Sequence, residues 1–207
     1  MAMSPGRQQT PSGRYVVLHW LAITALTAQF AGSEPRAWAS DGYSERTAYL
    51  LTRALGYDDS LRDHAKVEVG IAILFKNGDP VSERAAANMG AALDSLAGTT
   101  VQGLVLRSRL VPLAGATELK TIVGSRGVDV LYLCEGLDPF VDAIVKLSRE
   151  LKVLTVAGNE AMVRQGVALG ILLSAGSKGT LVVNLRIARA EGANFGSDLL
   201  RVARVIR

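Results

Sequence analysis

Strand-like and helix-like segments alternate four times along the middle of this 207-residue chain. Short apolar runs, typical of strands buried on both faces, are each followed by apolar residues at helical spacing. The expected strands cover residues 67–75, 101–110, 128–133 and 153–157. Because a helix between two strands carries the chain back across the sheet, this alternation predicts mostly parallel pairing with right-handed crossovers. We therefore expect a three-layer α/β/α sandwich with the first and third of these strands at its centre.

Two of the expected helices begin with an aspartate followed by a proline. The aspartate accepts a hydrogen bond from a free amide of the first turn, and proline fits there because its missing N–H is not needed. Asp79 therefore starts a helix that runs to about Leu96, and Asp138 starts another. Apolar spacing assigns the buried face of the first helix to Val81, Ala85, Met89, Ala92, Leu93 and Leu96. It assigns that of the second helix to Val141, Ile144, Val145, Leu147 and Leu151.

The last forty residues predict an antiparallel hairpin at the edge of the sheet. Two apolar runs, 171–174 and 180–184, are separated by a turn that contains Gly176 and Gly179, and glycine supplies the positive φ that such turns need. Gly192 then stops a short helical run. A final helical segment follows, which the Ser197 hydroxyl can cap.

The N-terminus has the pattern of an export signal. Arg7 and Arg14 precede an apolar run over residues 15–30, and Ala37-Trp38-Ala39 has the small-x-small pattern that signal peptidase accepts. We expect residues 1–39 to be a signal peptide, with a mature chain that starts near Ser40. The alternative is an apolar segment retained as an inner-membrane tether. Within the mature chain, residues 40–66 read as a helix and polar connector, and residues 67–207 as the α/β domain.

Charge and cysteine content exclude several functions. Three of the 23 basic residues and one of the 19 acidic residues lie in the first 39, so the remainder has a net charge of about +2. That balance gives no case for nucleic-acid binding, which needs basic side chains gathered on one face. The single cysteine, Cys134, rules out an internal disulfide and any site with paired cysteines. Its apolar neighbours indicate a small buried side chain at a strand end.

No catalytic signature is found in the sequence. It lacks a Gly-x-Ser-x-Gly elbow, a Walker lysine motif, a dinucleotide fingerprint after the first strand and a His-Glu-x-x-His motif. Lys178 lies between glycines, but that segment joins two strands, so it does not suit a phosphate. Asp58 and His64 lie in the acidic connector, where no second set of ligands completes a metal site. We expect no enzyme activity, no cofactor and no metal.

The segment from Val67 to Arg207 resembles the YfiR-like family of small periplasmic proteins. The residues that carry this resemblance lie mainly in the fourth strand and the closing stretch: Leu154-Thr155-Val156, Gly166, Val183-Asn184-Leu185, Ala188, Gly192, Ser197-x-Leu199-Leu200 and Ala203. Leu93-x-x-Leu96-Ala97-Gly98 and Val130-Leu131-Tyr132 fit the same pattern. Residues 44–66 lie outside the matched part.

The resemblance implies a non-enzymatic periplasmic regulator. Members are similar to a repressor that binds the periplasmic sensing domain of an inner-membrane diguanylate cyclase, lowers cyclic-di-GMP synthesis and so limits biofilm formation. An outer-membrane lipoprotein relieves that repression, and a homodimer is a further expectation. The familiar repressor relies on cysteine pairs, so its redox response is not expected in a chain with one cysteine.

Two sets of residues are candidates for contact with other molecules. A small-molecule site is the alternative function, because ligands of open α/β sheets bind beyond the carboxyl ends of the strands. The residues expected at that rim are Lys76, Asn77, Glu135, Asp138, Gly158, Asn159 and Glu160. Arginines recur near the C-terminus, and Arg201 and Arg204 are the candidates for contact with a partner protein, although a solvated face also explains them.

Overall fold

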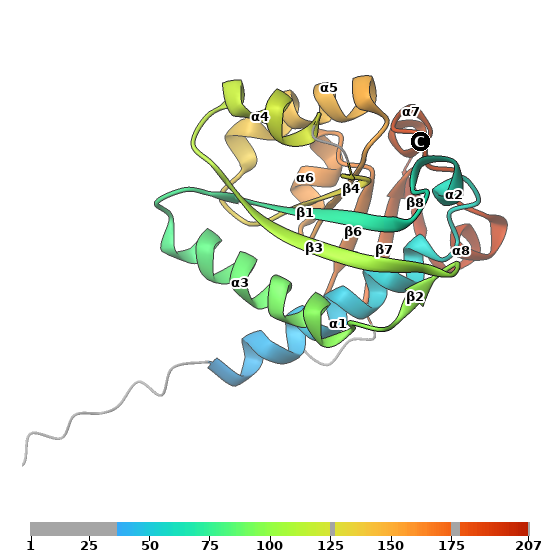
Figure 1. Ribbon diagram of the computed structural model, residues 1–207, viewed down its shortest axis with the longest axis horizontal. Helices are drawn as coiled ribbons and strands as arrows, with labels where there is room; N and C mark the ends of the chain where they lie inside the picture. The colour runs from blue at the N-terminus through green and yellow to red at the C-terminus, as the bar shows by residue number, and fades with distance from the viewer. Residues whose placement is uncertain (1–36, 125–126, 175–178, 207) are drawn as a thin grey trace, which may run out of the picture. The chain divides into compact units, whose positions relative to one another are not determined.

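The computed structural model describes residues 37–124, 127–174 and 179–206. Within them, eight strands form one sheet in the order β2-β3-β1-β4-β5-β6-β7-β8 (Figure 1). The strands are β1 Glu68–Lys76, β2 Thr100–Val101, β3 Leu104–Leu113, β4 Val130–Leu133, β5 Leu154–Ala157, β6 Leu169–Leu172, β7 Thr180–Asn184 and β8 Arg204–Ile206. Pairing is parallel except between β2 and β3 and between β6 and β7. The expected mixed α/β architecture is confirmed, with β1 and β4 in the middle of the sheet.

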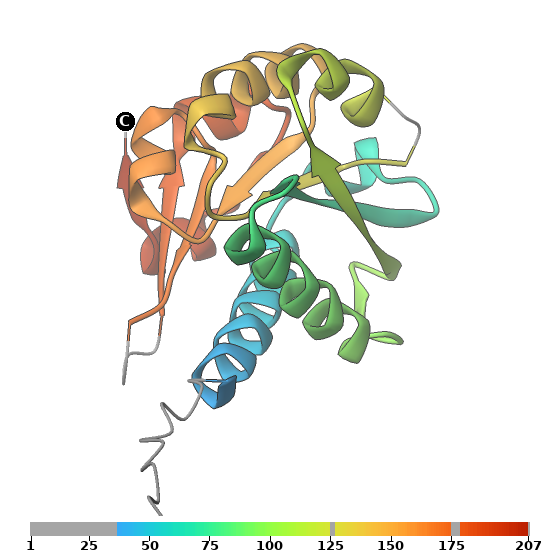
Figure 2. The same ribbon diagram turned by 90° about the vertical axis from the view of Figure 1, so that its left-hand side faces the viewer.

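Helices cover both faces of this sheet, as the two ribbon views show (Figures 1 and 2). The long helices α1 and α3 lie together on one face, α4 and α5 lie on the other, and α6 packs against α5 and β6. The helices are α1 Ala37–Leu55, α2 Leu61–His64, α3 Pro80–Ser95, α4 Ala116–Val123, α5 Val141–Leu151, α6 Glu160–Gln165, α7 Leu185–Ala190 and α8 Ser197–Val202. The core between these layers is aliphatic, as the low aromatic content of 5% requires.

Helix α3 begins as expected and buries Met89, Ala92 and Leu93 as predicted, but its first turn faces the sheet differently. The Asp79 carboxylate accepts hydrogen bonds from the amides of Val81 and Ser82, so the cap is confirmed. Val81, however, is 64% exposed, and the first turn buries Ser82 instead. The Ser82 hydroxyl explains this rotation, because it accepts from the Lys76 amide at 2.9 Å and donates to the Glu135 carbonyl at 2.6 Å.

Two other capping predictions are wrong, although α8 does begin at Ser197. Asp138 lies in a short 3₁₀ turn, Asp138–Phe140, and its side chain caps nothing; α5 begins at Val141. The buried face of α5 includes Ser148, while Leu151 at its end is exposed. Ser197 likewise makes no capping hydrogen bond in α8, where Gly196 holds the cap position.

Two strand boundaries also differ from expectation. The segment expected as one strand from residue 101 is a hairpin of β2 and β3, because Gln102 and Gly103 both have positive φ in a two-residue turn. Pro112 does not end β3, which continues to Leu113. Since β2 pairs only with Leu104 and Val105, Pro112 lies where the far side of β3 has no neighbouring strand, and proline is tolerated there.

The C-terminal hairpin is confirmed as antiparallel β6 and β7, with its turn residues 175–178 outside the described residues. The chain then adds a strand that the sequence did not indicate. After α7 and α8, β8 pairs in parallel with β7 and forms the outermost strand. The expected signal peptide falls mainly on residues 1–36, also outside the described residues, and Ala37 to Ala39 form the first turn of α1.

Candidate functional site

A cavity of about 390 Å³ opens at the carboxyl ends of β4 and β5. The lining comes from five elements or their ends: α1, α3, β4, the turn after β5, and α6. We call it the β4–β5 cavity. It is lined by Tyr43, Ser44, Ala85, Asn88, Met89, Tyr132, Leu133, Cys134, Glu135, Gly158, Asn159 and Met162.

Glycine after β5 leaves room for two phenol groups in the β4–β5 cavity. A Cβ atom built on Gly158 would lie 3.2 Å from the Tyr43 hydroxyl oxygen and 3.4 Å from that of Tyr132. The next residue, Asn159, caps α6 by accepting a hydrogen bond from the Met162 amide at 3.0 Å. The chain therefore turns away from the strand end without filling the hollow in front of it.

Helix α1 closes one side of the β4–β5 cavity. The Tyr43 hydroxyl donates a long hydrogen bond of 3.4 Å to the Gly158 carbonyl. One turn later the Thr47 hydroxyl donates to the Tyr43 carbonyl at 2.9 Å. The cavity thus depends on a helix that is distant in sequence from the strands that form its floor.

Glu135 gives the β4–β5 cavity a negative charge. Burial, followed by this carboxylate, raises the pKa of Tyr43 and raises that of the Cys134 thiol to about 12. Burial is also the main cause that raises the pKa of Tyr132, with Cys134, Tyr43 and Glu135 adding to it. Both phenols and the thiol are therefore neutral near pH 7. Cys134 is a buried, unreactive side chain, as its neighbours in the sequence indicated.

The structure brings together three of the seven residues expected at the rim, namely Glu135, Gly158 and Asn159. The other four do not line the β4–β5 cavity. The Lys76 ammonium lies 3.9 Å from the Asp79 carboxylate. The backbone N–H of Asn77 donates a hydrogen bond to the Leu113 carbonyl. Asp138 belongs to the 3₁₀ turn already described.

Glu160 forms ion pairs with two arginines and does not line the β4–β5 cavity. Its carboxylate lies 2.7 Å from Arg164 and 2.6 Å from Arg204, and hydrogen bonds from these guanidinium groups lower the pKa of Glu160. Arg201 is paired too, with Asp198 at 3.5 Å in the same helix. The two arginines proposed for partner contact therefore both have acidic neighbours within the chain.

Sequence reasoning missed the tyrosines and the helical residues of the β4–β5 cavity. It considered only the residues that follow the strands, whereas Tyr43, Asn88 and Met89 arrive on α1 and α3. Tyr132 offered a signal, because a phenol inside an otherwise aliphatic strand must bring its hydroxyl to a polar partner or to a hollow.

A second hollow, which we call the tyrosine groove, lies between the end of α1 and the β2–β3 hairpin. Its volume is about 640 Å³, and it is lined by Tyr49, Thr52, Arg53, Gly56, Tyr57, Leu96, Thr99, Thr100, Val101 and Gln102. Tyr49 is 55% exposed. The Arg53 guanidinium lies over the Tyr57 ring, 5.9 Å from its centre.

The connector between α1 and β1 is less solvated than its charges suggested. Asp58 is buried, and its carboxylate accepts hydrogen bonds from the amides of Ser60 at 3.0 Å and Asn194 at 2.8 Å. Burial is the main cause that raises its pKa. His64 contacts the Gly192 carbonyl at 3.3 Å, so the connector is tied to the loop after α7.

Glu191, at the end of α7, is the most deeply buried acidic side chain of the described residues, with 1% of its surface exposed. Its carboxylate lies 2.6 Å from the Ser148 hydroxyl of α5, and it accepts from the Thr155 amide of β5 at 2.7 Å. The Thr155 hydroxyl lies 2.9 Å from both carboxylate oxygens and also accepts from the Ala168 amide. Burial raises the pKa of Glu191 to about 7. We call this set the Glu191 network.

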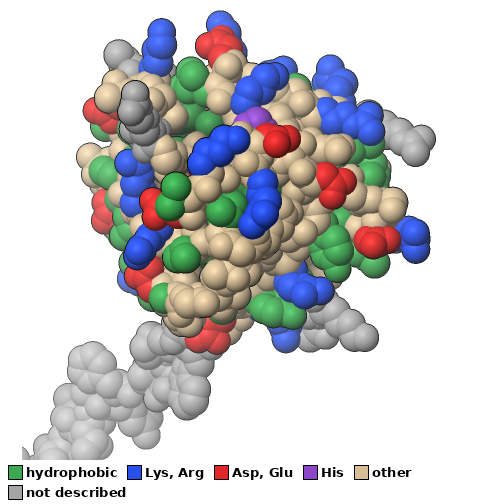
Figure 3. Space-filling view, turned by 45° about the vertical axis from the view of Figure 1, so that its right-hand side comes forward, with side chains coloured by type: hydrophobic (Ala, Val, Ile, Leu, Met, Phe, Trp, Pro, Cys, Tyr) green, Lys and Arg blue, Asp and Glu red, His purple; other side chains and the backbone are tan. Residues whose placement is uncertain are grey.

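In the part of the chain that the structure describes, no group of three or more His, Cys, Asp or Glu side chains is placed to hold a metal ion. No helix there is long and apolar enough to cross a membrane. Acidic and basic side chains are interspersed on the face drawn in Figure 3, with no broad region of one sign. Such a face does not suit a nucleic acid.

The comparisons with known proteins concern both the sequence and the fold. A model of the YfiR/HmsC-like family matches residues 73–204. A conserved domain protein from Vibrio cholerae O1 biovar El Tor has a TM-score of 0.55 and 12% identity, over 79% of this chain and 60% of that one. No curated protein matches the sequence.

Two further similar structures have printed descriptions that concern ligands. The ABC domain of Streptococcus pneumoniae in complex with L-Trp has a TM-score of 0.50 and 16% identity, over 74% of this chain and 60% of that one. A substrate-binding protein with adhesive properties from Clostridium difficile, in its ligand-free, open form, has a TM-score of 0.51 and 15% identity. The match covers 72% of this chain and 58% of that one. The chain thus spans about 60% of the length of these proteins. At such identities the likeness shows the fold alone.

Proposed function

We propose, because the chain belongs to the YfiR/HmsC-like family, that it is a non-enzymatic regulatory protein of the periplasm. It binds the periplasmic sensing domain of an inner-membrane signalling protein, a diguanylate cyclase or a sensor kinase, and thereby modulates cyclic-di-GMP signalling. The observation that carries this proposal is the family match over residues 73–204, which covers β2 to β7 whole and most of the α/β domain. An outer-membrane lipoprotein that relieves repression, and a homodimer, belong to the same proposal.

The tyrosine groove supports a docking role. Tyrosine and arginine are the side chains that contribute most strongly to protein–protein binding when they fill a partner's surface. Tyr49, Arg53 and Tyr57 lie along one groove, and Tyr49 is more than half exposed. Arg201 and Arg204 form a second proposed contact, where charge speeds encounter with an acidic partner.

A binding measurement tests this function. The purified chain is titrated by calorimetry with the periplasmic domain of the inner-membrane signalling protein encoded beside it, and we expect saturable binding. Combined Tyr49→Ala and Arg53→Ala should weaken it about tenfold or more. Arg201→Glu with Arg204→Glu should mainly slow association, most visibly at low salt.

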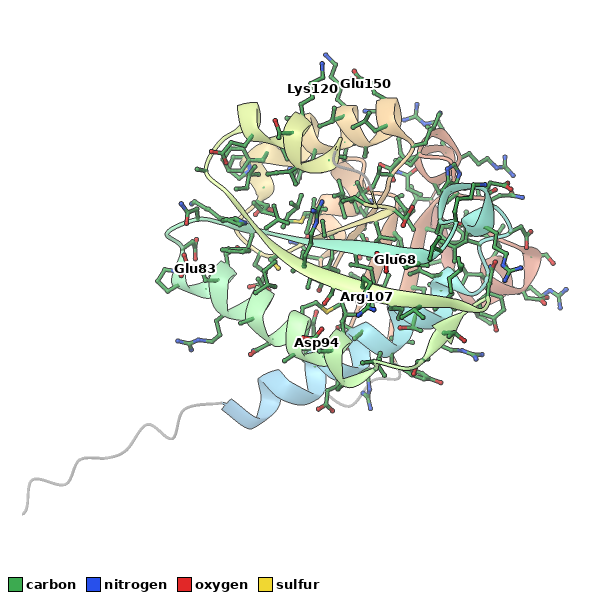
Figure 4. The ribbon with its side chains drawn as sticks, in the orientation of Figure 1. Glu68, Glu83, Asp94, Arg107, Lys120 and Glu150 are labelled. Carbon is green, nitrogen blue, oxygen red and sulfur yellow. The ribbon has the colours of Figure 1, made fainter. Side chains whose placement is uncertain are left out.

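The residues changed in the control variant lie on the face of the sheet opposite to α1 and the tyrosine groove. Lys120 on α4 and Glu150 on α5 point away from the sheet (Figure 4). Lys120→Ala with Glu150→Ala should leave partner binding unchanged. Failure of the unmodified chain to bind, or turnover of a metabolite by the pure protein, would contradict the proposal.

A second candidate function is a small-molecule binding module associated with a transporter or receptor. The β4–β5 cavity favours it, because it lies beyond the carboxyl ends of parallel strands, where open α/β sheets bind ligands. Its volume falls in the range of about 300–1,000 Å³ usual for such pockets. The printed descriptions of two similar structures, one a domain in complex with L-Trp and one a substrate-binding protein, add support. A ligand that binds here and alters partner affinity would join the two functions in one protein.

A further inference from the structure

We propose that the β4–β5 cavity selects small primary amines with an apolar body, pairs their ammonium group with Glu135, and rejects carboxylates of the same shape. The inference rests on the second candidate function above, that this cavity holds a ligand, and it names the chemical class of that ligand. Three properties of the cavity carry it: its charge, its apolar wall and one hydroxyl group that faces it.

The charge of the lining is one-sided. Among the lining residues that the structure describes, Glu135 is the charged side chain, and none is a lysine, arginine or histidine. Three basic side chains from neighbouring segments are paired with acidic groups outside the cavity: Lys76 lies beside Asp79, and Arg164 and Arg204 lie on Glu160. A ligand carboxylate would therefore leave water without gaining a cation, which is costly, whereas an ammonium would gain Glu135.

The rest of the lining suits an apolar body. Ala85, Met89, Leu133 and Met162 contribute aliphatic and thioether surface from both helical layers and from β4. Methionine adapts to irregular shapes and makes favourable contacts with aromatic rings. The rings of Tyr43 and Tyr132 add surface that attracts a cation over its face.

The Tyr132 hydroxyl supplies a polar group that the fold does not use. Tyr132 is only 7% exposed, and its hydroxyl faces the cavity without a hydrogen bond to any of the described residues. It lies beside the Tyr43 hydroxyl, since both are within 3.4 Å of the same point next to Gly158. Since no side-chain oxygen of the described residues is both buried and without a partner, this hydroxyl is open to the β4–β5 cavity and available to a ligand. As a neutral phenol it can accept a hydrogen bond from an ammonium.

Three probes with one aromatic body test the charge preference. The full chain is titrated by calorimetry near pH 7.5 with 2-phenylethylamine, L-phenylalanine and phenylacetate, which carry a cation, both charges and an anion. We expect the amine to bind at least about tenfold more tightly than phenylalanine, with no detectable binding of phenylacetate. Added salt should weaken the binding of the amine, because it screens the attraction between its ammonium group and Glu135.

Variants locate the site. Glu135→Gln should weaken amine binding about tenfold, and Tyr132→Phe about three- to tenfold, with thermal unfolding confirming that both are folded. Glu150→Gln removes an equal charge from α5, where the side chain points into solvent, and should change nothing (Figure 4).

Each contrary outcome has its own meaning. Binding of phenylacetate or phenylalanine as tightly as the amine, or an amine affinity unchanged in Glu135→Gln, would overturn the proposed selectivity and leave a ligand site of another class. If no probe binds at 10 mM, any binding free energy is weaker than about −3 kcal/mol. That result would overturn the amine assignment outright. Binding of the signalling partner, measured separately, would still stand or fall on its own result.

Discussion

The two ends of strand β5 hold polar side chains in opposite circumstances. Near its amino end, Thr155 and Glu191 join Ser148 in a network where the carboxylate and hydroxyl groups have hydrogen-bond partners. The hollow that touches Glu191 there measures about 10 Å³. Beyond its carboxyl end, Gly158 leaves a cavity of about 390 Å³ with the Tyr132 hydroxyl unpartnered within the described part of the chain.

This difference in hydrogen bonding indicates that the Glu191 network stabilises the fold, whereas the β4–β5 cavity is available for binding. A buried polar group with all its hydrogen bonds made fixes the elements that share it, here α5, β5 and α7. A polar group that faces a hollow contributes little to the fold and is free for a ligand. Substitutions at the Glu191 network should therefore lower the free energy of unfolding, and those in the β4–β5 cavity should change binding.

The largest effect is expected from Glu191→Ala. It removes the acceptor for the buried Thr155 amide and the partner of the Ser148 hydroxyl, and it leaves a void. We expect a loss of about 3–4 kcal/mol in the free energy of unfolding, measured with urea. Glu150→Ala on the solvent side of α5 is the control, and a loss for Glu191→Ala as small as its own would contradict the assigned role of the network.

The next effect is a dependence of stability on pH. Because the pKa of Glu191 is raised from 4.5 to about 7, the folded chain holds a proton in this interval that the unfolded chain has released. This stabilisation is fully present below about pH 4.5 and is lost as the pH rises through about 7. It amounts to about 3.5 kcal/mol at most, since one unit of pKa corresponds to about 1.4 kcal/mol.

Glu191→Gln isolates this contribution. The glutamine amide can donate to the Ser148 hydroxyl, which then donates to the Val145 carbonyl at 3.0 Å, while the glutamine oxygen accepts from the Thr155 amide. It thus imitates the protonated carboxyl group. We expect the stability of Glu191→Gln relative to the unmodified chain to increase between pH 5 and 8.5; a constant difference would show that Glu191 does not titrate there.

The smallest effect is expected in the β4–β5 cavity. Tyr132→Phe should change the free energy of unfolding by less than about 0.5 kcal/mol, because the lost hydroxyl has no partner among the described residues. Thr155→Val removes a hydroxyl that contacts Glu191 and the Ala168 amide, and should cost about 2 kcal/mol. Equal losses in the two variants, measured in urea at one pH, would erase the distinction between the two regions.

How much of this was accessible from the sequence differs between the sheet and the site. Continuous apolar strands and the Asp79–Pro80 start are local signals, so they predicted the alternation, the central strands and α3. The short strand β8 carries no such signal, because Arg204, Val205 and Ile206 become a strand only by pairing with β7.

The cavity and the network depend on distant parts of the chain. Glu135, Gly158 and Asn159 were predicted because strand ends meet at one edge of a parallel sheet. Tyr43 reaches that edge only through the packing of α1 across the sheet, which no local pattern encodes. Glu191 looked like the polar end of a short helix, and its burial depends on Ser148 and Thr155, 43 and 36 residues away.

The central claim, regulation of cyclic-di-GMP signalling through a periplasmic partner, is tested most directly in the cell. Cyclic-di-GMP is measured in strains that lack the gene, carry it, or carry the Tyr49→Ala and Arg53→Ala variant. The account predicts an increase on deletion that the unmodified gene reverses and the variant does not. An unchanged cyclic-di-GMP level after deletion, with the signalling partner present, would contradict it.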